Sequence, residues 1–263
     1  MATYTHGYHE SVLRSHRNRT VENSAAYLLP HLRPGDSLLD VGAGAGTITA
    51  DFARLVEHVT ATELDDHTLD LARTVAREHA IDNIEFAVAD VHALPFADDS
   101  FDVVHAHQVL QHVADPVQAL REMARVARPG GIVAVRDSDY SAFAWWPQLP
   151  ELDLWLDLYR IAARENGGEP DAGRRLLAWA HAADLTDITA TSSTWCYSTA
   201  EDRAWWGGMW ADRILTSAIA SQLVDNGHAT HDDLQRISDG WRRWAADADG
   251  WFSVLHGELI VRV

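Results

Sequence analysis

The stretch LLDVGAGAGTITA, from Leu38 to Ala50, decides the fold of this sequence. An apolar run ends in an acid, continues through alternating glycines, and reaches Thr47, where a helical pattern begins. Glycines make a loop that a ligand can approach closely along the backbone. A dinucleotide, a phosphate group or another nucleotide-like cofactor are the candidates for that ligand.

The spacing of the glycines argues against a dinucleotide, and the absence of lysine argues against a phosphate-binding loop. A dinucleotide fingerprint has the form G-x-G-x-x-G, and its third glycine would fall on Thr47. A phosphate-binding P-loop needs a lysine, whereas all 21 basic residues of this chain are arginines. A glycine-rich turn that binds no ligand remains the alternative for the loop taken alone.

Short apolar segments alternate with helical patterns around this loop. The predicted helices cover 47–58, 67–80 and 116–127, and the predicted strands cover 37–41, 59–63, 84–90, 101–107 and 130–137. This alternation predicts an α/β fold with a parallel sheet, helices on both faces, and ligands at the carboxyl ends of the strands. Beyond residue 139, helical patterns are interleaved with two further strands, at 187–198 and 252–263.

Two acids follow the second and third predicted strands. Glu63 lies 21 residues after Gly42, where a carboxylate can accept hydrogen bonds from both hydroxyls of a ribose. Asp90 ends the third strand and can accept a bond from an exocyclic adenine amine. The alternative for each acid is a helix N-cap, since Asp commonly caps a helix after a strand.

Four motifs carry a resemblance to a known family: LLDVGAGAGTIT, TATELD, VADVHALPFADDSFDVVHAHQVLQHVADP and RVARPGGIVAVRD. In order and spacing they resemble the class I S-adenosylmethionine (SAM) methyltransferases, especially the branch of the ubiquinone and menaquinone C-methyltransferases. The resemblance covers Leu32 to Asp137. It implies a Rossmann-like sheet of seven strands whose last strand is antiparallel, which agrees with the terminal ELIVRV.

The resemblance also assigns residues to the cofactor SAM. Glu63 would take the ribose hydroxyls, Leu64 would pack on the adenine, and Asp90 would contact the adenine edge beside the amide of Val91. The remaining positions, beneath the ribose and methionine portions or against the methionine end, are Gly42, Ala43, Gly44, His107 and Gln108.

Histidines near the fourth strand are the candidates for catalysis. His107 and His112 would act either as a general base, since imidazole titrates near neutral pH, or as groups that only position a ligand. We expect no metal ion, although Asp137 and Asp139 follow the fifth strand near these histidines, because the family's metal-site pattern is not recognisable here.

The N-terminal segment, residues 1–36, is expected to form a lid, as segments before the first strand often do in this family. Tyr8, His16 and Arg19 could then reach the methionine carboxylate or the acceptor. The alternative is a solvated helix face. The SAM-binding core would cover residues 37–139.

All 11 tryptophans lie at or after Trp145, so residues 140–263 differ in composition from the rest of the chain. We expect this part to form a helical cap that binds a small, planar, apolar acceptor such as a quinone, a phenol or a nitrogen heterocycle. A purely structural role in the core is the alternative for the tryptophans, and Trp241 and Trp244 at helical spacing favour it. The residues expected at the acceptor, beside the fifth strand or in loops, are Asp137, Asp139, Tyr140, Trp145, Trp146, Trp206 and Trp210.

The net charge of −18 argues against nucleic acid as a partner, because binding to phosphates needs a basic face. The sequence has no apolar run of transmembrane length, so a cytoplasmic protein is expected. Its single cysteine, Cys196, excludes an intramolecular disulfide. We further expect a monomer or homodimer. Two rivals to methyl transfer stay open. One is a SAM-binding protein without catalysis, and the other is a SAM-binding enzyme that catalyses a cyclisation or rearrangement.

Overall fold

Parallel strands carry the first half of the chain, as the sequence predicts. In the computed structural model, which describes residues 18–263, they lie in the order β3-β2-β1-β4-β5. β1 pairs with β2 on one side and with β4 on the other, so the connections change direction at its carboxyl end, where α/β sheets bind ligands. The bounds are β1 (Ser37–Val41), β2 (His58–Glu63), β3 (Ile84–Val88), β4 (Phe101–His107) and β5 (Ala127–Ser138).

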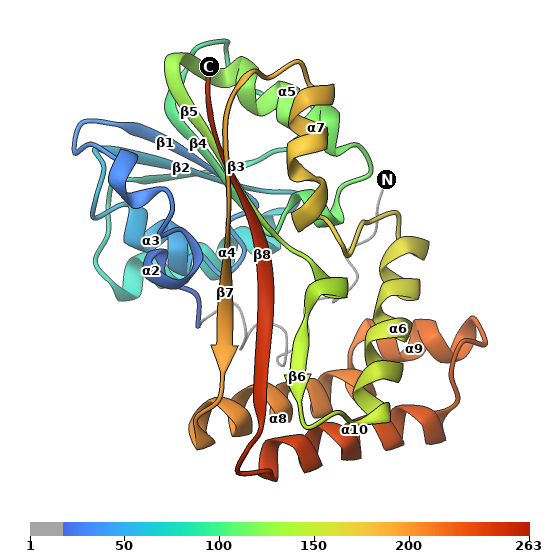
Figure 1. Ribbon diagram of the computed structural model, residues 1–263. Coiled ribbons are helices and arrows are strands. Elements are labelled where there is room, and N and C mark those ends of the chain that lie inside the picture. Colours follow the sequence, from blue (N-terminus) through green and yellow to red (C-terminus); the bar gives the residue numbers. More distant parts are fainter. Residues whose placement is uncertain (1–17) are drawn as a thin grey trace.

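Helices cover both faces of the sheet (Figure 1). Consecutive residues of β1 point to opposite faces, so Leu38 joins the apolar cluster of Phe52, whereas Leu39 joins the cluster of Leu120. The first face carries α2 (Val21–Ser24), α3 (Thr47–Phe52) and α4 (Asp66–Glu78), and the second carries α5 (Pro116–Val126) and α7 (Leu176–Ala182). Short 3-10 helices are η1 (Leu29–His31), η2 (Leu110–His112), η3 (Tyr140–Ala142) and η4 (Gly173–Arg175).

The strand β8 (Trp251–Arg262) completes the sheet in antiparallel orientation. One edge of β8 pairs along its length with β7 (Asp187–Tyr197). The other edge pairs first with β6 (Ala144–Trp146) and then with β5. The Rossmann-like fold with an antiparallel last strand is therefore confirmed, and β6 makes the sheet eight-stranded among residues 18–263 instead of seven-stranded.

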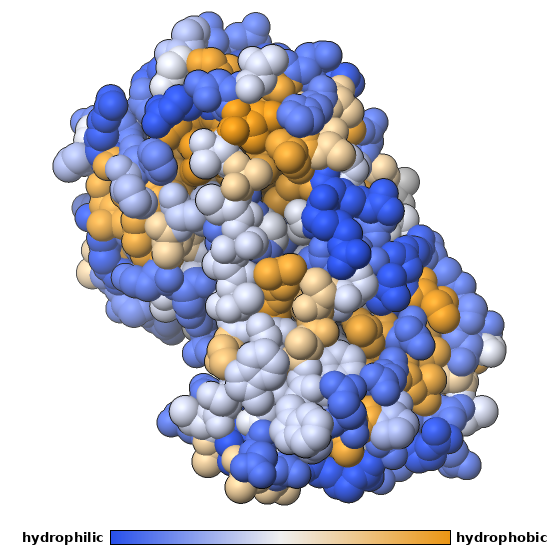
Figure 2. Space-filling model, viewed as in Figure 1, coloured by the Kyte–Doolittle hydropathy of each residue, from blue (hydrophilic) through white to orange (hydrophobic). Residues whose placement is uncertain are grey.

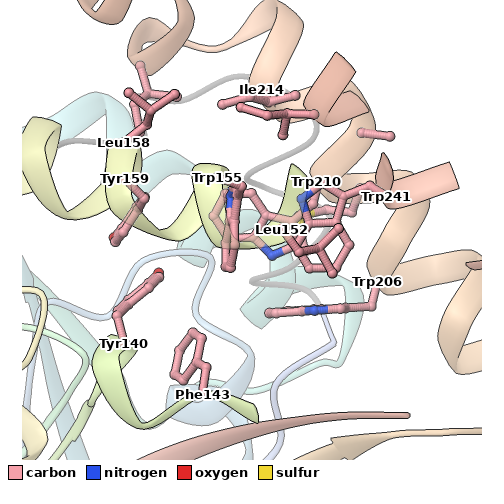
Figure 3. Packing of buried hydrophobic residues seen from close by; sticks show 14 of the residues in the cluster. Tyr140, Phe143, Leu152, Trp155, Leu158, Tyr159, Trp206, Trp210, Ile214 and Trp241 are labelled. Atoms are coloured by element: carbon pink, nitrogen blue, oxygen red, sulfur yellow. The ribbon is translucent and has the colours of Figure 1, made fainter. Parts of the chain in front are cut away.

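A second apolar core lies beyond the sheet, at the ends of β7 and β8 (Figure 1). Its helices are α6 (Pro150–Glu165), α8 (Ala200–Thr216), α9 (Ala218–Asp225) and α10 (His231–Ala246). Trp155 packs edge-on against Trp210 and Trp241 (Figure 3), and the ring centroids are 4.6 and 4.9 Å apart. We call the whole cluster, which also includes Trp145, Tyr159 and Phe252, the tryptophan core. The outline of the molecule narrows between this lobe and the lobe of the parallel strands (Figure 2).

The segment WWGGMW, from Trp205 to Trp210, corrects one expectation. Its glycines suggest a loop, but it lies inside α8. A Cβ atom on Gly207 would lie 2.8 Å from the Cβ of Ala245 and 3.0 Å from the carbonyl oxygen of Trp241. Gly207 therefore lets α8 and α10 pack closely. The helical spacing of Trp241 and Trp244 is confirmed, since both are buried residues of α10, which Thr230 caps.

One further difference is local. The helix expected over 47–58 ends at Phe52, because turn bonds from the Arg54 and Leu55 amides tighten the chain before β2. Between residues 18 and 263, no helix is long and apolar enough to span a bilayer.

Candidate active site

A cavity of about 500 Å³ lies over the glycine loop, at the carboxyl ends of β1, β2 and β4. We call it the loop cavity. The structure brings together here every residue assigned to the cofactor within the described part of the chain, and Tyr8 lies outside that part. Those lining residues are Gly42, Ala43, Gly44, Glu63, Leu64, Asp90, Val91, His107 and Gln108, and His112 lines the same cavity.

Glu63 lines the loop cavity and contacts the glycine loop. Its Oε1 atom accepts a hydrogen bond of 2.7 Å from the Gly44 amide, and its Oε2 atom accepts one of 3.3 Å from the Leu64 amide. Burial raises the pKa of Glu63. Leu64 is 59% exposed beside it, which is unusual for a leucine and leaves an apolar surface for a flat ring.

Neither Glu63 nor Asp90 caps a helix. Asp65 caps α4 by accepting from the Thr68 amide, and Asp115 caps α5. Asp90 instead accepts from the His92 amide at 2.9 Å and lies 2.6 Å from Nδ1 of the His92 ring, and these bonds lower the pKa of Asp90. The N-cap interpretation is therefore wrong for both Glu63 and Asp90.

A buried network fixes the loop from below. Asp40 accepts a bond of 2.6 Å from Oγ1 of Thr49, and its other oxygen lies 2.8 Å from Nδ1 of His105. Sequence reasoning gave Asp40 no role. Asp40 and His105 are register partners in the parallel pair of β1 and β4. An acid in the first predicted strand and a histidine in the fourth were the sequence signal for this contact.

A second cavity, of about 620 Å³, adjoins the loop cavity. We call it the aromatic cavity. Arg19 and Gln108 line both cavities, and Nη2 of Arg19 donates a bond of 2.6 Å to Oε1 of Gln108. The side-chain nitrogen Nε2 of Gln108 donates a bond of 2.8 Å to Oγ of Ser138. The aromatic residues that line the aromatic cavity are Tyr27, Tyr140, Phe143, Trp195, Tyr197, Trp205, Trp206 and Trp210.

The aromatic cavity contains only part of the set expected at the acceptor. Tyr140, Trp206 and Trp210 line it, whereas Asp137, Asp139, Trp145 and Trp146 do not line it. Sequence reasoning missed five aromatic lining residues, and the alternating pattern of β7 was the available signal for Trp195 and Tyr197. The missed residues are Tyr27, Phe143, Trp195, Tyr197 and Trp205.

The four expected residues that do not line the aromatic cavity have other contacts. Trp145 stacks on Phe252 with centroids 5.6 Å apart, in the tryptophan core, while Trp146 is 58% exposed on the opposite side of β6. Asp139 is buried and accepts two bonds from the Arg174 guanidinium, at 2.6 and 2.7 Å. Asp137 accepts a bond of 2.9 Å from the amide of Gln111.

The two histidines are poor general bases in this structure. Burial, aided by the positive charge of Arg19, lowers the pKa of His107 well below its usual value and that of His112 to about 3. A ring with so low a pKa is neutral at pH 7 and binds a proton weakly. This favours the positioning role over the base. Among residues 18–263, no three His, Cys, Asp or Glu side chains lie together as metal ligands would.

Asp137 makes the stability of the protein depend on pH. Burial raises its pKa to about 7, so the folded state holds this proton more tightly than the unfolded chain and stability is lost as pH rises through that value. Between about pH 5 and about pH 8, the variant Asp137→Asn should gain on the order of 2 kcal/mol in free energy of unfolding relative to the wild type. Urea unfolding at both pH values measures this difference. Asp184→Asn, at a carboxylate whose side chain is 89% exposed, is the control and should show no such trend.

Comparison with known proteins agrees with this geometry. A family model described as a methyltransferase domain matches residues 39–135. An uncharacterized methyltransferase of Schizosaccharomyces pombe is 34% identical over 98% of this chain and 96% of its own length. The ubiquinone/menaquinone biosynthesis C-methyltransferase UbiE of Hahella chejuensis is 44% identical over 136 residues, which cover 50% of this chain and 52% of that protein.

A solved structure shares the fold. A phosphoethanolamine N-methyltransferase of Haemonchus contortus, crystallised with S-adenosylhomocysteine, superimposes with a TM-score of 0.58 at 18% identity. The match covers 92% of this chain and 52% of that one.

Proposed function

This chain belongs to the class I SAM-dependent methyltransferases, and from that premise we propose that it methylates a small planar molecule held in the aromatic cavity. The acceptor classes that fit are quinones, phenols and nitrogen heterocycles. The observation that carries this proposal is a cavity of about 620 Å³, lined by eight aromatic residues of the described chain, directly beside the loop cavity. Cavities of this size and lining are typical of small-molecule sites.

The residues of the loop cavity fit SAM. The cofactor has no phosphate, so a loop without lysine suits it, and Glu63 offers two carboxylate oxygens near the glycine loop. The exposed Leu64 offers an apolar surface for the adenine. When bound, SAM supplies an electrophilic methyl group on a sulfonium.

The chain itself contributes mainly alignment. Gln108 lines both cavities and is held by Arg19 on one side and Ser138 on the other. A group fixed at this boundary can orient the reacting atoms of two ligands, which is the largest contribution a methyltransferase needs to make. His107 and His112, neutral at pH 7, position ligands in this proposal.

The division of labour between the parts of the chain follows from the two linings. Residues 37–139 form most of the lining of the loop cavity, and residues 140–263 form most of the lining of the aromatic cavity, which supports a core that holds the cofactor and a later segment that selects the acceptor. Residues 18–27 line the aromatic cavity as well, which supports a lid role for the N-terminal segment.

The acceptor site can be tested with two tryptophans of opposite placement. Trp206 lines the aromatic cavity and stacks on Tyr197 with centroids 4.4 Å apart. Trp206→Ala should raise the KM for the acceptor by about 5- to 150-fold, the effect of losing roughly 1–3 kcal/mol of aromatic contact. Affinity for SAM should stay within about twofold because Trp206 does not line the loop cavity.

Trp146→Ala is the matched control, since Trp146 is exposed and lies outside both cavities. A screen of quinones, phenols and nitrogen heterocycles, read by mass shift and by formation of S-adenosylhomocysteine, supplies the acceptor. If Trp206→Ala changes neither KM nor turnover, the aromatic cavity is not the acceptor site.

A further inference from the structure

One wall of the aromatic cavity is polar, and three strands build it. Arg136 of β5 and Thr191 of β7 are both register partners of Glu258 in β8, which lies between them. Nε of Arg136 lies 3.1 Å from Oε1 of Glu258, and Oγ1 of Thr191 donates 2.9 Å to Oε2. Ser193 accepts bonds of 3.2 and 3.1 Å from Nε and Nη2 of Arg136. This arrangement fixes the guanidinium in one orientation.

Within the described part of the chain, Nη1 of Arg136 on this wall has no hydrogen-bond acceptor, and the whole side chain is only 1% exposed. The hydroxyl of Tyr27, which lines the same cavity from the segment before β1, is likewise buried with no partner among residues 18–263. Buried donors are almost always satisfied in folded proteins, and an unsatisfied one costs about 1–3 kcal/mol. Both residues line the aromatic cavity, so a ligand there can supply the missing acceptor.

Both groups stay donors near neutral pH. Burial lowers the pKa of Arg136 only to about 10, so the guanidinium keeps its charge. Burial raises the pKa of Tyr27 well above its usual value, so the phenol keeps its proton.

The described lining of this cavity is richer in basic than in acidic residues, unlike the chain as a whole. The whole chain carries −18, yet the described lining holds three arginines, Arg19, Arg136 and Arg213, against two acids, Glu22 and Glu258. The acid Glu22 is exposed at the rim, while Arg136 and Arg213 are 1% and 4% exposed. Among the described lining residues that are buried, two arginines, Arg136 and Arg213, stand against one acid, Glu258, and positive charge in a cavity lining favours an anionic ligand.

We propose that the acceptor carries an anionic oxygen on its planar ring, a carboxylate or a phenolate, and that Arg136 and Tyr27 bind this oxygen. The proposal rests on the aromatic cavity being the acceptor site. The guanidinium of Arg136 lies over the ring of Trp195, 5.0 Å from its centroid, so a flat ligand can stack beside the group that binds its charge. The backbone carbonyl oxygen of Arg136 accepts a bond of 2.7 Å from the backbone amide of Gln108. This bond connects the anion site to the boundary between the two cavities.

Matched planar probes test the charge preference. 2-Naphthoate and 2-naphthamide have nearly the same shape and differ in charge, and 2-naphthol offers a phenol. Binding to the full chain saturated with S-adenosylhomocysteine can be followed by tryptophan fluorescence, because Trp195, Trp205, Trp206 and Trp210 line the cavity. We expect 2-naphthoate to bind at least about tenfold more tightly than 2-naphthamide. If phenolate is the preferred form, affinity for 2-naphthol rises with pH and exceeds that for 2-naphthoate.

Tyr27→Phe separates a binding role from a structural one. The variant deletes a buried hydroxyl without a partner, so the free energy of unfolding should stay the same or rise. The preference for 2-naphthoate over 2-naphthamide should nevertheless fall by about tenfold, since one charge-assisted hydrogen bond is lost. Tyr159→Phe removes a hydroxyl from the tryptophan core outside both cavities and should leave the preference unchanged.

Arg136→Lys is the second variant. It keeps a cation near Glu258 but loses the rigid fork that presents Nη1, so the preference should again fall while SAM affinity is kept. Equal binding of 2-naphthoate and 2-naphthamide to the wild type would overturn the anion proposal and leave the acceptor cavity standing. Failure of all three probes to bind, together with an acceptor KM unaffected by Trp206→Ala, would overturn both.

Discussion

Replacing Glu63 by alanine should weaken the binding of SAM and S-adenosylhomocysteine by roughly 1.5–3 kcal/mol, the range measured for hydrogen bonds to a charged group. The carboxylate lines the loop cavity beside the glycines, where Oε1 accepts from the Gly44 amide and Oε2 from the Leu64 amide. Glu63→Gln keeps the shape and one acceptor oxygen, so its loss should be smaller. Isothermal titration calorimetry measures both.

The pH dependence of this affinity has a defined sign. Because burial raises the pKa of Glu63, the carboxylate is protonated at a higher pH than an exposed glutamate. A protonated carboxyl accepts fewer hydrogen bonds, so the affinity for SAM should fall as pH drops through the raised pKa. Glu85→Ala, at an exposed acid of β3 outside both cavities, should change neither the affinity nor its pH dependence. An unchanged affinity in Glu63→Ala would remove the ribose role from this residue.

The second large effect concerns the third glycine of the loop. Gly46 has φ +79°, and a Cβ atom there would lie 2.6 Å from Cα of Ala72, in the backbone of α4. Gly46→Ala should lower the free energy of unfolding by about 3 kcal/mol or more, because left-handed strain of about 1 kcal/mol adds to a clash that backbone atoms cannot relieve cheaply.

Gly130→Ala isolates the strain from the clash. Gly130 has nearly the same φ, +81°, but no atom lies within 4 Å of the position its Cβ would occupy. This variant should cost only about 1 kcal/mol in urea unfolding, the cost of the backbone conformation alone. Equal losses in the two variants would mean that the contact between Gly46 and α4 adds nothing to stability.

The sequence predicts the loop cavity well because its residues are local to strand ends. Glu63 ends β2, and Asp90 and the glycines follow β3 and β1, strands that are recognisable from their own composition, and parallel strands bring their carboxyl ends together. Even the competing N-cap interpretation could have been rejected from sequence, since Asp65 and Asp115 are better placed to cap the helices that follow.

The aromatic cavity resists prediction because its residues meet only through distant strand pairing. Arg136 and Glu258 are 122 positions apart, and nothing in either segment names the other as its partner. Trp145 and Trp146 are adjacent, yet pairing of β6 with β8 buries one and exposes the other, and the sequence alone does not reveal that a three-residue strand forms there. In α8, Gly207 serves helix packing, although glycine pairs in sequence favour a loop.

The position of β8 in the sheet has a consequence for the order of events during synthesis. It follows β5, β6 and β7 in the chain and pairs with all three, so during translation those strands leave the ribosome before their common partner. Until residues 251–262 emerge, β7 has no strand to pair with and the edge of β5 is open, which exposes the nascent chain to association with others. Glu258 arrives on the same strand, so the charge partner of Arg136 joins the protein in the step that closes the sheet.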